Sequence, residues 1–152
     1  MPLVSLEELP PKGALLGLDP GSKTIGVAGC DPLRMIASPV EAIVRGKKLA
    51  PALDRLLELY DGRKSVGMVV GLPVNMDGTE GPRAQSARAL VRNILERRDV
   101  PLAFWDERLS TAGAERALLE ADASRARRAE LIDKLAAAWI LQGAIDRLNP
   151  AS

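Results

Sequence analysis

Acidic residues follow two short apolar runs of the sequence, at positions that favour chemistry. Asp19 directly follows the run 14–18 and precedes a Pro-Gly pair. Asp106 and Glu107 directly follow the run 102–105. Sites in open α/β sheets gather at the carboxyl ends of strands, so these carboxylates are candidate catalytic groups. Each also has an ordinary interpretation, because an Asp before Pro-Gly often only shapes a turn and acids after a strand are often only solvated.

Asp133 is a third candidate, and it stands inside a helical pattern. The apolar residues 131–132 and 135–138 surround it. Asp is a poor residue for a helix interior, and a carboxylate beside an apolar face needs a partner or a cation. A salt bridge with Arg128 or another basic side chain is the structural alternative.

The sequence has no His and a single Cys, Cys30. These counts exclude Ser-His-Asp and Cys-His catalysis, His-ligated zinc and disulfides within the chain. We expect Cys30 to be a buried small residue. If the three acids converge, their oxygen ligands suit Mg²⁺ or Mn²⁺, and one or two such ions serve phosphoryl transfer without any His.

Two glycine-containing segments leave alternatives open. Residues 17–26 form neither a P-loop nor a Gly-x-Gly-x-x-Gly motif, but their hairpin amides, with Lys23, either face a phosphate or only close a tight hairpin. The loop 71–81 is long and polar, and Asn75 in it either contacts a substrate or satisfies the turn.

Basic residues are concentrated in two stretches. Residues 83–98 hold five Arg and one Glu, and a second group follows at Arg125, Arg127, Arg128 and Lys134. Such an excess suits a polyanion, although a solvated helix face explains either group alone. Aromatic side chains are only 3% of the chain, so a stacking platform for single-stranded nucleic acid is not expected.

The hydrophobic pattern predicts the elements that must position these groups. Strands are expected at 14–18, 24–30, 35–44, 66–72 and 102–105, and helices at 49–60, 82–97 and 110–121. A basic stretch at 124–129 is expected to precede a last, long helix that runs through about 148. Pro39 implies an edge strand, a bulge or a bend. The order β-β-β-α-β-α-β-α, with two helical segments after the last strand, predicts an α/β fold with a mixed five-stranded sheet and helices on both faces. We expect one domain at 14–148, an N-terminal extension at 1–13 that is ordered only if it docks, and a tail at 149–152.

The N-terminus lacks a basic start followed by an apolar run, and no apolar stretch approaches the ~18 to 20 residues that cross a bilayer. We therefore expect a cytoplasmic protein with no membrane partner.

Five segments, in order along the chain, carry a resemblance to a known family. They are Leu16-Gly-Leu-Asp-Pro-Gly-Ser-Lys-Thr-Ile-Gly-Val-Ala28, Ala37-Ser-Pro39, Val69-Val-Gly-Leu-Pro-Val-Asn-Met-Asp-Gly-Thr-Glu-Gly81, Trp105-Asp-Glu-Arg-Leu-Ser-Thr111 and Asp133-Lys-Leu-Ala-Ala-Ala138. The chain resembles the YqgF/RuvX family of RNase H-like nucleases, described as pre-16S rRNA nucleases and Holliday-junction-resolvase-like proteins. Thr24 departs from the family, which often has a basic residue there.

The resemblance implies an RNase H-like fold and a carboxylate site for one or two Mg²⁺ or Mn²⁺ ions. Asp19, Glu107 and Asp133 match the catalytic, metal-ligating acids, with Asp106 as the alternate to Glu107 and Glu130 as a weaker candidate for a fourth ligand. Further residues would contact phosphate or substrate: Lys23, Asn75, Arg83 and Arg108.

The function that the resemblance implies is metal-dependent hydrolysis of structured nucleic acid, foremost at the 5′ end of pre-16S rRNA in ribosome biogenesis. Branched DNA, as in recombination or repair, is the competing substrate. A nucleic-acid-binding assembly or transcription factor with little nuclease activity is the alternative from another class, and an actin-like ATPase is a third, because those proteins share this fold. We expect a monomer or a weak homodimer.

Overall fold

The computed structural model describes residues 3–21, 23–109 and 125–149, and side chains for all of these except 109, 125–131 and 133. The helix expected at 110–121 therefore lies outside the described residues. The other expected helices and strands are all present. Their ends differ from the expected ones by at most two residues, except that the last helix begins at Arg125 and so includes most of the basic stretch that was expected to precede it.

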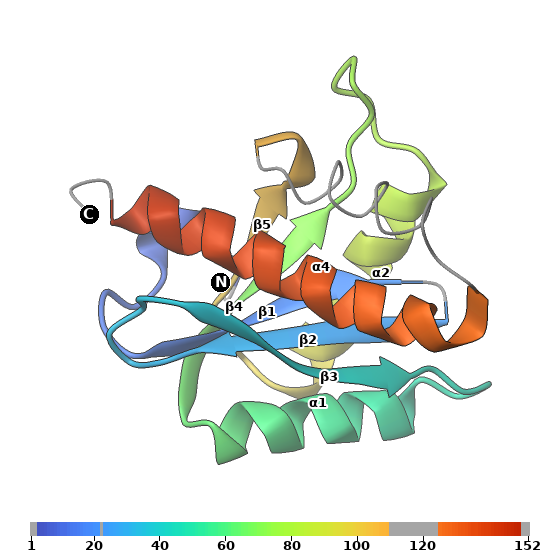
Figure 1. The fold of residues 1–152 in the computed structure, drawn as a ribbon, viewed down its shortest axis with the longest axis horizontal. Coiled ribbons are helices and arrows are strands. Elements are labelled where there is room, and N and C mark those ends of the chain that lie inside the picture. Colours follow the sequence, from blue (N-terminus) through green and yellow to red (C-terminus); the bar gives the residue numbers. More distant parts are fainter. Residues whose placement is uncertain (1–2, 22, 110–124, 150–152) are drawn as a thin grey trace.

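A mixed five-stranded sheet forms the centre of the molecule (Figure 1). Its strands are β1 (Ala14–Pro20), β2 (Thr24–Cys30), β3 (Ala37–Val44), β4 (Ser65–Leu72) and β5 (Leu102–Asp106). They lie in the order β3-β2-β1-β4-β5; β2 is antiparallel to both β1 and β3, and β4 and β5 run parallel to β1. The predicted mixed α/β sheet is confirmed.

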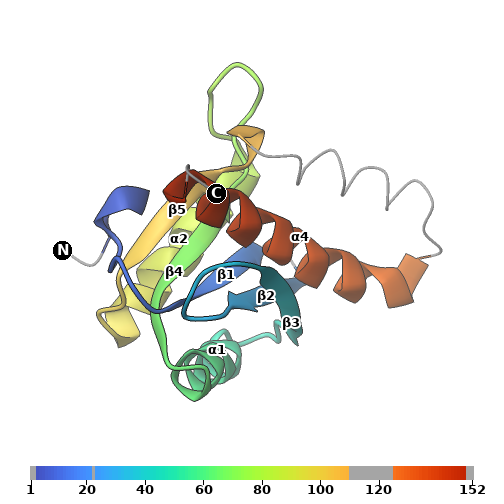
Figure 2. The same ribbon diagram turned by 60° about the vertical axis from the view of Figure 1, so that its left-hand side comes forward.

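Helices cover both faces of this sheet, as Figure 2 shows from the side. On one face, α1 (Ala50–Gly62) and α2 (Pro82–Arg97) pack on a core that includes Leu16, Leu18, Leu56 and Leu90. On the other face, α4 (Arg125–Leu148) packs alone on a core that includes Leu15, Val69, Trp105 and Ile140. Both faces of β1 are buried, which explains why its apolar run shows no alternation.

The edge strand β3 accommodates Pro39 as the sequence predicts. Pro39 lies opposite Ala28, whereas Glu41 lies opposite Val27, so one extra residue of β3 bulges between them. A proline without an N–H and a bulge both discourage pairing of this edge with another strand.

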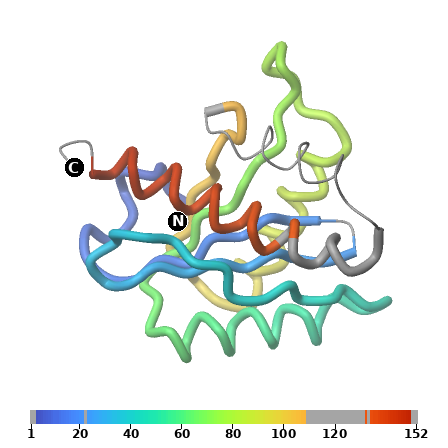
Figure 3. The backbone as a smooth tube through the Cα atoms, viewed as in Figure 1, coloured from blue at the N-terminus to red at the C-terminus, as the bar shows by residue number. Residues whose placement is uncertain are grey.

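The N-terminal segment is docked along the sheet (Figure 3). Leu3 forms a bridge to Leu102, the N–H of Val4 donates to the carbonyl of Leu102 at 2.9 Å, and the short 3-10 helix η1 (Leu6–Glu8) follows. Leu6 and Leu9 are buried in the core under α4. The segment is ordered because this apolar burial offsets the entropy that it loses.

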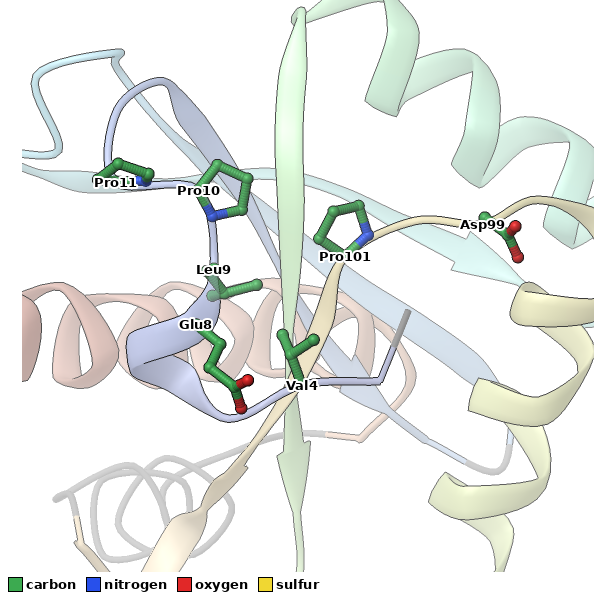
Figure 4. Close-up of a pocket in the computed structure, with 7 residues that line it drawn as sticks. All are labelled: Val4, Glu8, Leu9, Pro10, Pro11, Asp99 and Pro101. Atoms are coloured by element: carbon green, nitrogen blue, oxygen red, sulfur yellow. The ribbon is translucent and has the colours of Figure 1, made fainter. Parts of the chain in front are cut away.

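A cavity of about 390 Å³ lies between this segment and the start of β5 (Figure 4). It is lined by Val4, Glu8, Leu9, Pro10, Pro11, Asp99 and Pro101. Because Pro101 directly precedes β5, the cavity lies at the amino ends of the parallel strands, away from Asp19 at the end of β1.

Cys30 is buried and free, and its sulfur accepts a hydrogen bond from the N–H of Leu15 at 3.3 Å. Burial raises the pKa of the Cys30 thiol, which favours its neutral form. The expectation of a buried small residue is confirmed.

Candidate active site

Asp19 lies near the carboxyl end of β1 and is only 2% exposed. Leu15 belongs to the core under α4, and a Cβ at Gly17 would lie 2.7 Å from the Cβ of Leu141 in α4. Alternate residues of a strand share a face. Asp19 therefore lies on the α4 face of the sheet.

Glu107 lies on the same face, directly after β5. Its Oε1 is 3.4 Å from the position that a Cβ would occupy at Gly71, where the Cδ1 atom of Ile140 is also only 2.5 Å away. Gly71 belongs to β4, between β1 and β5, and follows Val70, which lies opposite Leu18. Gly71 is thus level with Asp19, one strand spacing of about 4.8 Å away. The structure brings Asp19 and Glu107 together on either side of Gly71.

Gly71 is a residue of the site that the sequence interpretation did not single out. A Cβ here would force the buried side chain of Ile140 to shift, and it would touch the carboxylate of Glu107 at van der Waals distance. A glycine inside an otherwise apolar strand pattern often marks a close approach of this kind, and that signal was available in the run 66–72.

Asp106, the alternate to Glu107, is oriented differently. It is separated by one position from Glu107 and by two from Phe104, which packs on the α1–α2 side of the sheet. Its carboxylate accepts two hydrogen bonds from the Arg108 guanidinium, at 3.1 Å from Nε and 2.7 Å from Nη2. This guanidinium holds the pKa of the Asp106 carboxyl below its usual value. Asp106 is therefore engaged with Arg108 rather than with Asp19.

Arg108 itself is directed to protein groups. Besides Asp106, its Nη1 lies 3.5 Å from the carbonyl oxygen of Met76 in the loop between β4 and α2. The expected substrate contact at Arg108 would therefore require it to share its donors with Asp106.

Asn75 closes the same loop. Its backbone N–H donates to the carbonyl of Thr79 at 2.8 Å, and its Nδ2 donates to the Thr79 hydroxyl at 3.0 Å. The hydroxyl and N–H of Thr79 both donate to Asp77, and these bonds lower the pKa of the Asp77 carboxyl. The side chain of Asn75 thus serves the turn in this structure.

Lys23 and Arg83 are exposed cations, as Arg108 is, but they differ from Arg108 in their partners. Lys23 lies in the hairpin between β1 and β2, close to the strand end that carries Asp19, and Arg83 lies in the first turn of α2. Within the described part of the chain, neither forms an ion pair.

Most of the predicted basic group at 83–98 is paired with acids from other segments. Arg88 forms two hydrogen bonds with Glu80, at 2.6 and 2.7 Å, and lies over the ring of Phe104. The other pairs are Arg97 with Asp54 and Arg98 with Asp61. The expected excess of positive charge is thus largely neutralised, because the partners come from parts of the sequence outside that stretch.

Asp133 lies in α4, but its side chain is outside the described residues, as are those of Glu130 and the basic residues at 125–128. Along the helix, Ala137 and Ile140 follow Asp133 by about one and two turns, and both are buried against the sheet. Among the residues whose side chains are described, no group of three or more His, Cys, Asp or Glu is placed to hold a metal ion. The described part of the site contributes two carboxylates.

Comparison with known families gives the chain its assignment. The family model "RuvX: Holliday junction resolvase" matches residues 13–147. The chain belongs to the RuvX family. The resemblance seen in the sequence is thereby confirmed, and membership of this nuclease family makes the chain a hydrolase that acts on phosphodiester bonds.

Curated members of the RuvX family resemble the chain along nearly all its length. A protein of Paracoccus denitrificans named "Putative pre-16S rRNA nuclease" is 60% identical over 143 residues, which cover 94% of this chain and 90% of the relative. A protein of Phenylobacterium zucineum with the same name is 54% identical, and the match covers 98% of this chain and 99% of that relative.

Among solved structures, the Thermus thermophilus RuvC in complex with a Holliday junction substrate matches with a TM-score of 0.55 and 16% identity. The match covers 91% of this chain and 95% of that one. This likeness shows the fold, which is RNase H-like as expected. In the part of the RuvX chain that the structure describes, no helix is long and apolar enough to span a membrane.

Proposed function

We propose that this RuvX-family chain is a divalent-metal-dependent nuclease for structured nucleic acid, with Asp19, Glu107 and Asp133 as its catalytic, metal-ligating residues. One observation carries the proposal. Asp19, near the end of β1, and Glu107, directly after β5, both lie next to Gly71 of the intervening strand β4, on the α4 face of the sheet.

The donor set fits Mg²⁺ or Mn²⁺. Asp19 and Glu107 offer only carboxylate oxygens, the ligands that these cations prefer, and the sequence has no His that would favour zinc. Neighbouring carboxylates repel each other, and a cation relieves that repulsion. Asp133, from α4, is the proposed third ligand. One or two ions bound there would supply Lewis-acid activation of water and stabilisation of the leaving oxygen.

The chain's own residues would position the substrate around this centre. The missing side chain at Gly71 leaves the Glu107 carboxylate close to the β4 backbone. Lys23, in the hairpin after β1, and Arg83, in the first turn of α2 after β4, are exposed and suited to contact phosphates. Arg108, held by Asp106, and Asn75, bonded to Thr79, keep the β4–α2 loop beside the site.

For the substrate, we propose the 5′ end of pre-16S rRNA, supported by the names of the relatives at 54 to 60% identity. Branched DNA is the competing substrate, and the description of the family model favours it. For either substrate, we propose that the protein is cytoplasmic and monomeric or weakly dimeric. We also propose that its nuclease domain spans residues 14–148.

The test is cleavage by the purified chain of a precursor 16S RNA and of a four-way DNA junction, each with Mg²⁺, with Mn²⁺ and with chelator. We expect metal-dependent cleavage, faster on the RNA, and loss of cleavage on the order of 10²-fold or more in Asp19→Asn. Asp99→Asn is the matched control, because Asp99 is an exposed acid at the other end of the sheet.

Two results would contradict the proposal. Cleavage by Asp19→Asn at the rate of the unchanged chain would remove the site assignment. Tight RNA binding without cleavage under any metal condition, lost on substitution of Arg83 but not of Asp19, would favour the assembly or transcription factor instead. Faster cleavage of the four-way junction than of the RNA would replace pre-16S rRNA by branched DNA as the proposed substrate.

A further inference from the structure

Four basic residues gather at the end of the sheet that carries Asp19. Lys23 lies in the β1–β2 hairpin, and Arg45, Lys47 and Lys48 lie in the loop between β3 and α1. Hydrogen bonds join the two connections, because the N–H of Arg45 donates to the carbonyl of Lys23 at 2.8 Å and its Nη1 donates to that of Gly21, also at 2.8 Å. We call these four residues the hairpin–loop cluster.

The hairpin–loop cluster has no acidic partner within the described residues. Five arginines elsewhere on the surface are instead engaged in ion pairs with acids: Arg55, Arg88, Arg97, Arg98 and Arg108. Residues 42–53 contain no Asp or Glu. The acid just before them, Glu41, is held by Arg55 through bonds of 2.7 and 3.0 Å. The positive charge of the cluster is therefore uncompensated, which suits a polyanion.

Strand register places the cluster beside the candidate active site. Asp19 lies opposite Gly26 of β2, and two residues earlier Thr24 lies opposite Val44, which directly precedes Arg45. Both connections emerge at the same end of the molecule, at the right of Figure 1. Arg83 follows β4, on the other side of β1 in the strand order, and lies in the first turn of α2.

We propose that the hairpin–loop cluster binds the phosphate backbone of the nucleic acid on the β3 side of the cleaved phosphate. The inference rests on the proposed nuclease function and assigns residues to the grip on its substrate. Lys47 and Lys48 are exposed and contact phosphates directly, whereas Arg45 also fixes the two connections to each other. Backbone contacts of this kind position a substrate without reading its sequence.

The experiment measures binding without cleavage, in an Asp19→Asn background. The probe is a labelled RNA hairpin that carries the 5′ end of 16S rRNA with its precursor extension, titrated at a series of salt concentrations. The test variant combines Lys47→Ala with Lys48→Ala. The matched control combines Lys12→Ala with Lys64→Ala, which removes two exposed lysines, likewise without an ion pair in the described part of the chain, at the opposite end of the sheet.

We expect the test variant to bind about tenfold more weakly or worse at 0.1 M salt, and its slope of log K against log salt to be shallower by about 1.4 to 1.8, which corresponds to two lost phosphate contacts. The control should keep the slope of the parent protein. Equal slopes in test and control variants would overturn the inference. Cleavage is measured in a separate assay. If the nuclease proposal fails, the unchanged chain will not cleave the RNA, although the salt dependence of binding without metal can still differ between the test and control variants.

Discussion

The two ends of the central sheet satisfy their charged groups in opposite ways. At the amino end of β1, the guanidinium of Arg34 is 6% exposed and donates to the carbonyls of Gly13 at 2.7 Å and Pro10 at 2.5 Å. At the carboxyl end, Lys47 and Lys48 are exposed and form no ion pair within the described residues, and Asp19 is buried. At the amino end of β1, which we call the closed end, the charge of Arg34 serves the fold. At the carboxyl end, which we call the open end, the charges of Lys47 and Lys48 are available to a ligand.

The closed end shows what a buried cation requires. Arg34 has a φ of 54°, in the left-handed region, and burial lowers the pKa of its guanidinium. Both costs are tolerated because the N-terminal segment gains a fixed attachment, and the side chain of Asn149 also donates to the carbonyl of Arg34 at 3.2 Å. At the open end, the described residues supply no such partner for Lys47 or Lys48. This difference between the two ends favours an external polyanion as the partner of the lysines.

The largest effect is expected at Glu107. Glu107→Gln keeps the shape of the side chain but removes its charge, so we expect cleavage to fall on the order of 10³-fold. Asp106→Asn should stay within about tenfold, because that carboxylate binds Arg108. Initial rates at saturating Mg²⁺ measure both. Similar losses of cleavage rate in the two variants would contradict the different roles that the contacts of Glu107 and Asp106 indicate.

The next effect concerns stability at the closed end. Arg34→Met leaves the carbonyls of Gly13 and Pro10 without these donors, and we expect the free energy of unfolding to fall by about 3 kcal/mol. Arg45→Met, at the open end, removes one bond to Gly21 from a half-buried side chain and should cost about 1 kcal/mol. Urea unfolding measures both values. The contrast between the ends fails if Arg45→Met costs as much as Arg34→Met.

A smaller change is expected at Gly71. In Gly71→Ala the new Cβ would meet Ile140 at 2.5 Å and the Glu107 carboxylate at 3.4 Å, so we expect a loss of about 1 to 3 kcal/mol in unfolding free energy together with slower cleavage. Gly62→Ala is the control, because nothing lies within 4 Å of that Cβ position. A Gly71→Ala protein as stable and active as the control would show that the close approach is unimportant.

The smallest effect concerns acid stability at Asp106. Arg108 lowers the pKa of Asp106 in the folded chain, so this pair stabilises the fold above about pH 4, and the contribution is lost as the pH falls through the lowered folded value. Because both side chains are partly exposed, we expect Arg108→Gln to cost less than about 1 kcal/mol at pH 7, and a smaller amount at about pH 2. Urea unfolding at the two pH values measures this. A cost that is the same at both would contradict it.

Local pattern was enough to predict most of the fold. The apolar run 66–72 and the helical spacing in 82–97 correspond closely to β4 and α2, because a two-sided buried strand and an amphipathic helix leave distinct periods in the sequence. The bulge at Pro39 was also predictable, because proline lacks the N–H that a ladder needs. The mixed character of the sheet was predictable too, because the short links between the first three strands and the longer helical crossovers after them favour antiparallel and parallel pairs respectively.

The candidate site was only partly predictable, because its parts are distant in the sequence. Asp106 ends β5 and Glu107 begins a 3-10 helix, so the direction of each side chain depends on where the strand stops, and the sequence does not tell which face of the sheet a helix will cover. The structure separates them, since Asp106 binds Arg108 and Glu107 approaches Gly71 under α4. Likewise, the Arg-rich stretch at 83–98 looked free until Glu80, Asp54 and Asp61 were brought to it.

The sequence by itself determined the kinds of group that are available: carboxylates after strand ends, no imidazole, and lysines in the loops. Their types and local spacing are properties of the chain, so they could be known before folding. Only the tertiary structure decided which charges are neutralised, as at Arg88 and Glu80, and which stay exposed, as at Lys47 and Lys48. The physical reason is that electrostatic interactions depend on distance in space, and packing of the helices on the sheet sets that distance.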